Sequence, residues 1–586
     1  RFALPASNRL TRPTTHAIVS NTSKSVMNMQ PSQPSPTRNE GLKSSIPTLA
    51  GNIAGTLADP AADRFSDDDY EYLKFHGIYQ QDDRDLRKTG KKWIFMVRGR
   101  LPGGVVTPDQ YLAFDELSSL HGNDTLRITS RQGFQFHGVI KSGLRPLIQG
   151  MHQVLSTTLA ACGDVNRNVM APPTPSTSPL TDEVLADAKS VNDALLPVTR
   201  AYHEIWLEDT NVTPKDPDPD FVDPLYGKTY LPRKFKIAFA IPPLNDTDVY
   251  TNCLGYVAIE ENGKLIGYNL LAGGGLGMSH NNPETYPRLG DVMGYVPKDR
   301  LIESAKAVLK VHRDFGDRTN RKHSRLKYVI AERGADWFRQ EFAVRAGFEL
   351  QPAHPFEFKH QGDQFGWHQQ HDGLWFLGLH VLSGRVADHD NYRLKSALRK
   401  IIAQFKPEMR LTPSQNLLLV GLPADAKAAI DAILQEHGIE SAEQTGPLHR
   451  ASMACPALPT CGLALAESER FLPKLLSSIE SALQNAGLDK QELIVRMTGC
   501  PNGCARPYVA ELGFIGRGPG RYQLNVGGNA SCTRLNQPLV ASVKEEEIVP
   551  TLQPIFERYA KERQNGERFG DWCNRVLLPE TESAAS

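Results

Sequence analysis

Four cysteines in the C-terminal part of the chain constrain its fold more than any other feature. They form two short pairs, Cys455 with Cys461 and Cys500 with Cys504, and an amphipathic helical pattern over residues 463–483 lies between the pairs. A set of four soft thiolate ligands binds either a tetrahedral zinc ion or an iron-sulfur cluster. The sequence therefore predicts a fold that brings both pairs to one metal centre.

The spacing within the pairs favours a cluster over zinc. Five residues separate the first two cysteines and three separate the second two, whereas the pairs of structural zinc sites are normally separated by about two to four. Residues that shape wide loops, suited to a cubane cluster held by four cysteines, lie in or beside these gaps: Pro456, Pro459, Pro501 and Gly503. Zinc is the alternative. The other cysteines are expected to be buried as small hydrophobic residues without an assigned role: Cys162, Cys253, Cys532 and Cys573.

The composition is that of an ordinary globular protein. The 586 residues are 40% hydrophobic and 23% charged, and a chain of this length holds roughly four domains. No run of about 18 apolar residues occurs, so no membrane-spanning helix is expected. The 66 basic residues balance 66 acidic ones, and the basic excess lies in the first 39 residues, so a basic nucleic-acid-binding domain is not expected. The sparse cysteines indicate a reducing compartment.

Two internal echoes indicate a duplicated chain. Residues 126–138 align with 409–421, and residues 267–274 align with 521–528. Their order predicts an A-B-A′-B′ arrangement in an α+β fold with mixed sheets. We expect half-domain A at 66–150, domain B at 151–345, half-domain A′ at 346–428 and domain B′ at 429–586. Residues 1–65, rich in Ser, Thr and Pro, are expected to be a disordered tail, a mis-assigned start or an organellar transit segment.

Three predicted strands carry pairs of cations on one face. A period of two groups Lys234 with Lys236 in residues 234–241, Arg98 with Arg100 in residues 93–100, and Arg127 with Arg131 in residues 126–136. One interpretation is a solvated sheet face. The other is a partly dry site in which the cations bind a small oxyanion or a polycarboxylate cofactor. The glycine run at 273–277 lacks the context of a phosphate-binding loop and is interpreted as a turn or a close backbone approach.

Several ordered motifs resemble the siroheme-dependent sulfite and nitrite reductases. The resemblance extends from about Phe75 to Asp571 and is carried by FHGIYQQDDRD at 75–85, RQGFQFHG at 131–138, NRN at 166–168, LPRKFK at 231–236 and MTGCPNGC at 497–504. It implies duplicated ferredoxin-like halves with pseudo-twofold symmetry. It also implies a siroheme and a [4Fe-4S] cluster at the interface between the halves.

The resemblance also implies roles for individual residues. The cluster ligands would be Cys455, Cys461, Cys500 and Cys504, and Cys504 would also be the axial ligand of the siroheme iron. The substrate cations would be Arg98, Arg167, Lys234 and Lys236. The siroheme carboxylates would be held by Arg127, Arg131 and His137, and Asn502 would be a further cofactor contact.

The activity implied by the resemblance is the six-electron reduction of sulfite to sulfide in sulfate assimilation and cysteine biosynthesis. Lys236 favours sulfite over nitrite, because nitrite reductases of this family tend to carry Asn at this position. Electrons are expected from NADPH through a separate flavoprotein subunit, with ferredoxin as the alternative. The rival from another class is a non-catalytic zinc protein that binds an anion or nucleic acid. No nucleic-acid or membrane partner is expected, and the expected location is the cytoplasm, with a plastid or other organelle as the alternative.

Overall fold

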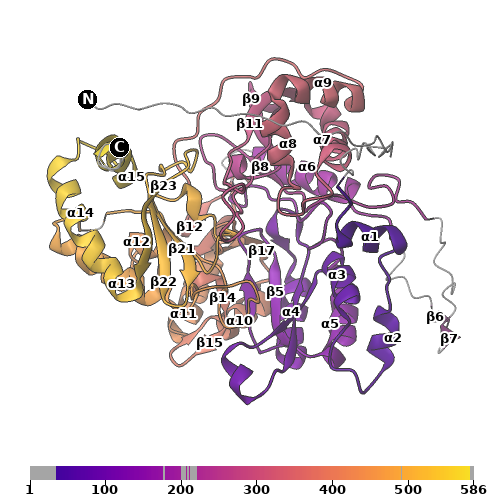
Figure 1. Cartoon of the computed structure of the whole chain (residues 1–586). Helices are drawn as coiled ribbons and strands as arrows, with labels where there is room; N and C mark the ends of the chain where they lie inside the picture. Colours follow the sequence, from indigo (N-terminus) through magenta and orange to yellow (C-terminus); the bar gives the residue numbers. More distant parts are fainter. Residues whose placement is uncertain are drawn as a thin grey trace, which may run out of the picture. The chain divides into compact units, whose positions relative to one another are not determined.

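The computed structural model describes residues 34–175, 179–199, 221–489 and 491–580, together with the backbone of the short strands β6 (Trp206–Leu207) and β7 (Thr210–Asn211). Figure 1 shows the arrangement of the elements along the chain. Among the described residues, no helix combines the length and the apolar character needed to cross a membrane.

Halves A and A′ are each built on a five-stranded sheet. The sheet of half A has the order β1-β2-β5-β4-β14, and that of half A′ has the order β12-β13-β18-β17-β3. The first contains β1 (Ile78–Asp82), β2 (Trp93–Arg98), β5 (Phe134–Val139), β4 (Leu126–Ile128) and β14 (Arg385–Val386). The second contains β12 (Gly366–Gln369), β13 (Trp375–Leu379), β18 (Leu417–Leu422), β17 (Glu408–Leu411) and β3 (Val105–Val106).

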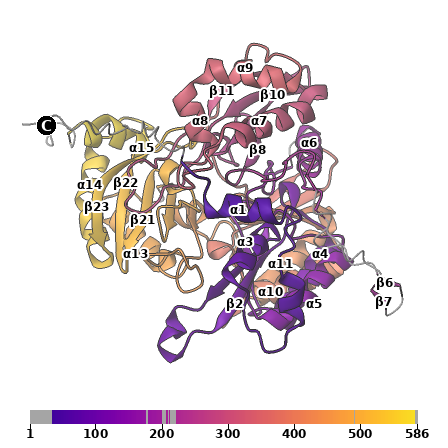
Figure 2. The ribbon, with the colours of Figure 1, turned by 45° about the vertical axis from the view of Figure 1, so that its right-hand side comes forward.

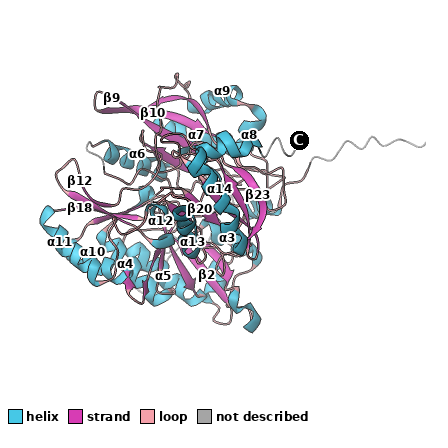
Figure 3. Cartoon of the chain, turned by 90° about the vertical axis from the view of Figure 1, so that its left-hand side faces the viewer, coloured by secondary structure: helices cyan, strands magenta, loops and turns pink. Residues whose placement is uncertain are grey.

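The two halves exchange short strands. Strand β14 follows β13 in the chain but pairs with β4 of half A, and β3 follows β2 but pairs with β17 of half A′. Helices α4 (Pro108–His121), α5 (Lys141–Gln153), α10 (Leu394–Phe405) and α11 (Lys427–Glu436) form one layer beside the sheets (Figure 3). One continuous core contains buried side chains from both halves. The halves therefore fold as one unit, because each completes the other's sheet.

Domains B and B′ each combine a mixed sheet with helices. The sheet of B has the order β11-β10-β9-β8, and that of B′ has the order β19-β20-β21-β22-β23. Domain B contains α6 (Leu180–Ala194), β8 (Ile237–Ala240), β9 (Leu254–Glu261), β10 (Lys264–Ala272), β11 (Asp291–Pro297), α7 (Leu301–Phe315), α8 (Leu326–Arg333) and α9 (Ala335–Ala346). Domain B′ contains α12 (Pro447–Arg450), β19 (Ser452–Ala454), α13 (Leu472–Asn485), β20 (Val495–Thr498), β21 (Leu512–Gly518), β22 (Arg521–Val526), β23 (Gln537–Lys544), α14 (Ile548–Glu562) and α15 (Phe569–Trp572). A small hairpin, β15 (Asp388–His389) with β16 (Tyr392–Arg393), lies between β14 and α10.

Both echoes fall on equivalent elements, so the predicted duplication is confirmed. The first covers the β4–β5 and β17–β18 hairpins, whose turns place Gln132 and Gln415 at φ of 51° and 75°. The second covers the ends of β10 and β22, where Gly273 and Gly527 adopt φ of 87° and 98°. These are left-handed conformations that favour glycine. The close backbone approach expected at 273–277 is present, because a Cβ on Gly274 would lie 2.1 Å from the carbonyl oxygen of Tyr250.

Two predicted strands are shorter than expected. Residues 126–136 form a hairpin rather than one strand, because the turn in which Thr129 N–H donates to the Gly133 carbonyl breaks the period of two. Arg131 therefore lies in a turn. Strand β8 begins only at Ile237, although Lys234 and Lys236 precede it in an extended segment that pairs with residues 166–170.

Residues 36–65 belong to the fold, which corrects, for this segment, the expectation of a disordered tail over 1–65. They form α1 (Arg38–Ser45) and α2 (Ile53–Ala58) ahead of α3 (Asp67–Phe75). Leu49 is fully buried, and Lys43 is buried among the carboxylates of Glu40 and Asp164. Burial against residues far away in the chain leaves no periodic pattern in the local sequence, so composition alone did not predict it. Residues 1–33 lie outside the described residues.

Candidate cofactor and anion site

The two cysteine loops leave the same edge of the sheet of B′. Strands β19 and β20 are parallel neighbours, with Ala454 opposite Met497. Cys455 follows the end of β19 directly, and Cys500 lies just beyond the end of β20. Because parallel strands end side by side, this topology brings the two loops together. The structure thus brings the two cysteine loops to the same end of the sheet.

The four thiols influence one another electrostatically. Burial raises the pKa of Cys455 well above its usual range, and Cys504, Cys461 and Cys500 raise it further. Burial likewise raises the pKa of Cys500 to about 12. Such thiols lose their protons readily only when a metal balances the charge. Among the described residues, no three His, Cys, Asp or Glu side chains converge closely enough to hold a single metal ion.

Hydrogen-bond donors face the sulfur atoms. The Gly499 amide donates to Cys455 Sγ at 3.3 Å, and the Asn502 side-chain amide lies 3.6 Å from Cys500 Sγ. Cys455 and Cys461 lie in a small apolar cluster. Cys504 is the exposed member of the set. Buried sulfurs with amide donors, together with one accessible sulfur, fit a cluster that shares one ligand with a second group.

Unpaired cations gather beside Cys504. Burial, together with Arg131 and Arg325, lowers the pKa of Lys236 to about 7, and the groups that oppose this shift are the thiols of Cys504 and Cys253. Burial and Arg325 lower the pKa of Lys234 well below its usual range. Within the described part of the chain, the side chains of Lys234, Lys236 and Arg325 have no hydrogen-bond or ion-pair partner. These side chains are half-buried, and such a group of cations without carboxylates favours an anionic ligand.

Arg98, Gln135 and His137 form a connected chain of polar side chains in half A. With its amide oriented to satisfy both neighbours, Gln135 accepts from Arg98 Nε at 3.1 Å and donates to His137 Nε2 at 3.2 Å. His137 then carries its proton on Nδ1, a buried atom without a partner among the described residues. Arg98 also donates to Cys162 Sγ at 2.9 Å. The free Nδ1–H fits an acceptor such as a cofactor carboxylate.

Arg131 and Arg167 approach the cations from two further segments. Arg131 donates to Asn252 Oδ1 at 2.9 Å and to the Ile237 carbonyl at 2.6 Å, and its Nε has no partner among the described residues. Arg167 is buried and donates to the Gly163 carbonyl at 2.9 Å. Its main chain pairs with Phe235, the residue between the two lysines. The structure thus brings the predicted substrate cations into one neighbourhood, with donors left free.

Arg127 is engaged within the protein. It is fully buried, donates to Glu469 at 3.0 Å and to the Ala454 carbonyl at 2.8 Å, and shares Glu469 with Arg385. Burial alone would raise the pKa of Glu469, but Arg127 and Arg385 outweigh it and lower the pKa to about 2. The Glu469 amide in turn donates to the Cys455 carbonyl. Arg127 therefore fixes the first cysteine loop against half A.

A buried ion pair joins equivalent positions of the two repeats. Asp248 and Arg506 both adopt left-handed φ, of 47° and 54°, and their side chains pair with each other. Arg496 contributes a second cation to Asp248 at 2.5 Å. Arg506 also donates to the Ser130 carbonyl, and Ser130 Oγ donates to the Cys504 carbonyl at 2.7 Å. This network holds Cys504 next to the turn that carries Arg131.

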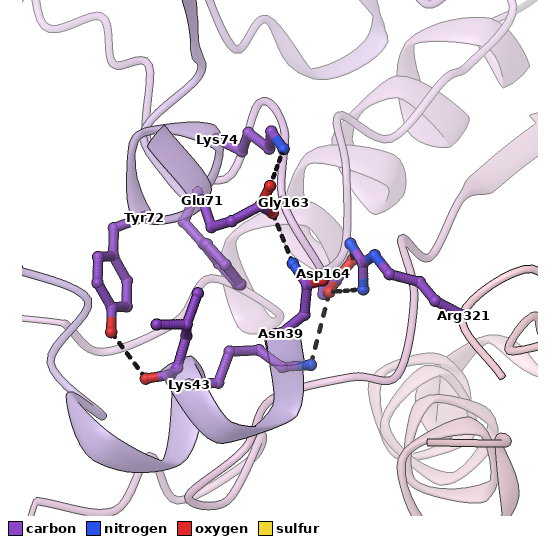
Figure 4. A pocket seen from close by; sticks show the side chains of 10 residues that line it. Asn39, Lys43, Glu71, Tyr72, Lys74, Gly163, Asp164 and Arg321 are labelled. Carbon is purple, nitrogen blue, oxygen red and sulfur yellow. Dashed lines mark hydrogen bonds and ion pairs between the residues drawn. The ribbon is translucent and has the colours of Figure 1, made fainter. Parts of the chain in front are cut away.

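Asp164 lies behind the cations and links them to helix α1. Figure 4 shows its carboxylate facing Lys43 and Arg321. Arg321 donates to it at 2.7 and 3.1 Å, Lys43 lies 3.5 Å away, and the Asp164 carbonyl accepts from Leu231 N–H. The carboxylate thereby secures the segment that leads into Lys234.

Sequence reasoning missed four neighbours of this site. Arg325 and Tyr79 lie among the cations, and the thiols of Cys162 and Cys253, expected to have no role, face them. Tyr79 lies in strand β1, within the motif at 75–85, but nothing local shows that it joins Cys162, Cys253 and Arg325, because these residues come from separate segments that meet only in the folded chain.

Comparisons with known proteins place this geometry in context. The family model "Nitrite and sulphite reductase 4Fe-4S domain" matches residues 186–350 and 445–581, and "Nitrite/Sulfite reductase ferredoxin-like half domain" matches residues 87–154 and 368–437. The sulfite reductase [NADPH] hemoprotein beta-component of Myxococcus xanthus (strain DK1622) is 48% identical over 92% of this chain and 96% of its own length. The protein of the same name from Shouchella clausii (strain KSM-K16) is 46% identical over 92% of this chain and 94% of its own length.

A solved structure has the same fold. The Mycobacterium tuberculosis NirA protein superimposes with a TM-score of 0.75 at 24% identity and covers 92% of this chain and 96% of its own length. The match confirms the fold expected from the internal echoes.

Proposed function

Since this chain belongs to the nitrite and sulfite reductase family, we propose that it reduces sulfite to sulfide with a siroheme and a [4Fe-4S] cluster. The observation that carries the proposal is the set of half-buried cations beside the exposed Cys504 that have no carboxylate partner among the described residues. Relatives that share nearly half of the sequence carry sulfite reductase names. A siroheme is rich in carboxylates and sulfite is a dianion, so both suit this charge.

The four cysteines would hold the cluster in this proposal, and the exposed Cys504 would also contact the siroheme. When bound, the two groups supply the coordination site for sulfur and the path for six electrons. Gly499 N–H and the Asn502 amide stabilise the thiolates by hydrogen bonding. The ion pairs of Glu469 with Arg127 and of Asp248 with Arg506 fix the two cysteine loops before any metal binds.

The siroheme carboxylates would be bound by Arg131 and His137, whose Nε and Nδ1 atoms lack acceptors among the described residues. Arg127 supports this region from behind, because its donors already serve Glu469 and the Cys455 loop. Arg325, whose side chain has no partner within the described part of the chain, adds a cation from domain B. The macrocycle would thus be held by half A and domain B, which belong to the same repeat.

Sulfite is held by Arg98, Arg167, Lys234 and Lys236. Its three oxygens must leave as water, which requires protons at each step. A pKa of about 7 lets Lys236 hold or release a proton near neutral pH, and an adjacent dianion raises that pKa and favours the charged form. Arg98 and Arg167 remain cationic and fix the oxyanion.

In this proposal the electrons come from NADPH through a separate flavoprotein subunit. The names of the relatives include NADPH and describe those proteins as beta-components. Ferredoxin is the alternative donor. The expected location is the cytoplasm.

Absorption spectroscopy and metal analysis of the anaerobically purified protein test the proposal together. We expect tetrapyrrole bands, iron in excess of one atom per chain, and sulfide production from sulfite with reduced methyl viologen. A colourless protein that contains zinc and no iron would instead support the zinc-stabilised binding protein.

A further inference from the structure

Two exposed leucines lie next to the first cysteine loop. Leu463 is 66% exposed and follows Cys461 by two positions, and Leu86 is 45% exposed in the turn of residues 85–89 between β1 and β2. Exposed leucines are common singly, but these two lie on segments that pack against each other. Neither has a part in the anion site described above.

The loop between β1 and β2 packs directly on the first cysteine loop. The Arg84 amide donates to the Pro459 carbonyl at 3.3 Å, and the Arg84 guanidinium donates to the Ala464 carbonyl. Asp85 forms an ion pair with Arg470 at 2.8 Å. We call the surface formed by residues 83–92 and Leu463 the hairpin face. Figure 2 shows the β1–β2 hairpin extending from the body of the molecule at the lower left.

The hairpin face carries a surplus of positive charge. Residues 82–92 contain five bases, Arg84, Arg87, Lys88, Lys91 and Lys92, against three acids, Asp82, Asp83 and Asp85. Asp82 pairs with Arg87 and Asp85 with Arg470, so two of the acids are neutralised locally. Lys88 and Lys92 are exposed and have no partner among the described residues. Lys91 and Arg64 lie over the ring of Trp93.

We propose that the hairpin face is the docking surface for the flavin-bearing domain of the donor flavoprotein, through an acidic surface of that domain. The inference rests on the proposed function and names where its electrons enter. Exposed leucines beside a surplus of bases fit a transient partner, since electron-transfer encounters bury less than about 1,200 Å² and are steered by charge. The hairpin face contacts the loop between Cys455 and Cys461 through the hydrogen bond from Arg84 to Pro459, which gives a short path to the cluster.

The test compares two electron sources in the holoenzyme. The variant Lys88→Glu with Lys92→Glu reverses two charges without partners among the described residues, and Lys264→Glu with Lys561→Glu reverses two exposed lysines, at the start of β10 and on α14. Sulfide formation is measured with reduced methyl viologen and with NADPH plus the flavoprotein, at low and at high salt. The variant Leu463→Gln is assayed with the same two electron sources to test the contribution of the exposed leucine.

At low salt we expect the first variant to lose at least tenfold in the flavoprotein-driven rate at limiting flavoprotein. Its viologen-driven rate should stay within twofold of wild type, and the control should keep both rates. Raising the salt concentration should reduce the difference in flavoprotein-driven rate between the variant and wild type. Unchanged flavoprotein-driven turnover would overturn the proposal. An equal loss with both reductants would also overturn it, because the lysines would then act on the reaction centre.

Two further results separate this inference from the proposed function. If reduced ferredoxin drives wild-type turnover and the flavoprotein does not, the flavoprotein assignment is overturned. If the wild-type protein forms no sulfide with reduced methyl viologen, the proposed function itself fails, whatever the hairpin face binds.

Discussion

Replacing Asp164 by Asn removes a carboxylate shared by three basic side chains behind the anion site. The Asp164 side chain is 4% exposed, Lys43 is 3% exposed, and Arg321 and Arg233 complete the group. Asn has the same shape and keeps hydrogen-bonding atoms but no charge. The variant therefore isolates the electrostatic contribution of this carboxylate to the stability of the fold.

The expected loss of stability follows from how exposed the basic partners of Asp164 are. Removing one member of a buried ion pair costs about 3–5 kcal/mol. Lys43 keeps Glu40 as a partner and Arg321 is partly solvated, so we expect the lower end, about 3 kcal/mol. With an m-value of about 3 kcal/mol/M, the urea midpoint of the transition that includes α1 should fall by about 1 M.

The matched control is Asp314→Asn. Its carboxylate also pairs with two arginines, Arg313 and Arg345, but is 30% exposed. Exposed pairs contribute about 1 kcal/mol or less. Equal midpoints for the two variants, measured by tryptophan fluorescence and circular dichroism, would refute the reasoning.

The pH dependence gives a second check. Burial alone would raise the pKa of Asp164, but Arg321 and Lys43 outweigh it and hold the pKa well below its usual range. A depressed carboxylate pKa stabilises the fold above the unfolded pKa, about 4, and this stabilisation is lost as the pH falls through the folded pKa. The difference between wild type and variant should therefore be constant from pH 5 to 8 and shrink below pH 4.

Three other substitutions test the site. Lys236→Asn should lower sulfite turnover at least tenfold and nitrite turnover less, because sulfite carries the greater negative charge; equal losses in viologen-driven assays would contradict this. Cys500→Ser should remove cluster iron and its visible absorption, whereas the buried Cys532→Ser should retain both. Glu469→Gln removes the carboxylate that pairs with Arg127 and Arg385. It should destabilise the protein by about 3 kcal/mol and lower its iron content. The control Glu467→Gln, whose partner is half-exposed, should change the stability by less than about 1 kcal/mol.

Local patterns predicted much of this fold. The echo at 126–138 and 409–421 identified two equivalent hairpins. Alternation also placed Lys234 and Lys236 on one side, although regular strand begins only at Ile237. The same period of two failed at Arg131, because a turn with a left-handed residue at Gln132 leaves no trace in hydrophobic alternation.

The amino-acid sequence by itself determined the duplication, the grouping of the four cysteines into two short motifs and the cationic character of the anion site, because strand periods and ligand spacing are local properties of the chain. Only the tertiary structure decided that Arg127 serves the Cys455 loop, that Arg325 joins the lysines and that residues 36–65 pack on the rest of the fold. Those contacts join segments far apart in the chain. Their partners are selected by burial and charge in three dimensions, which no local spacing records.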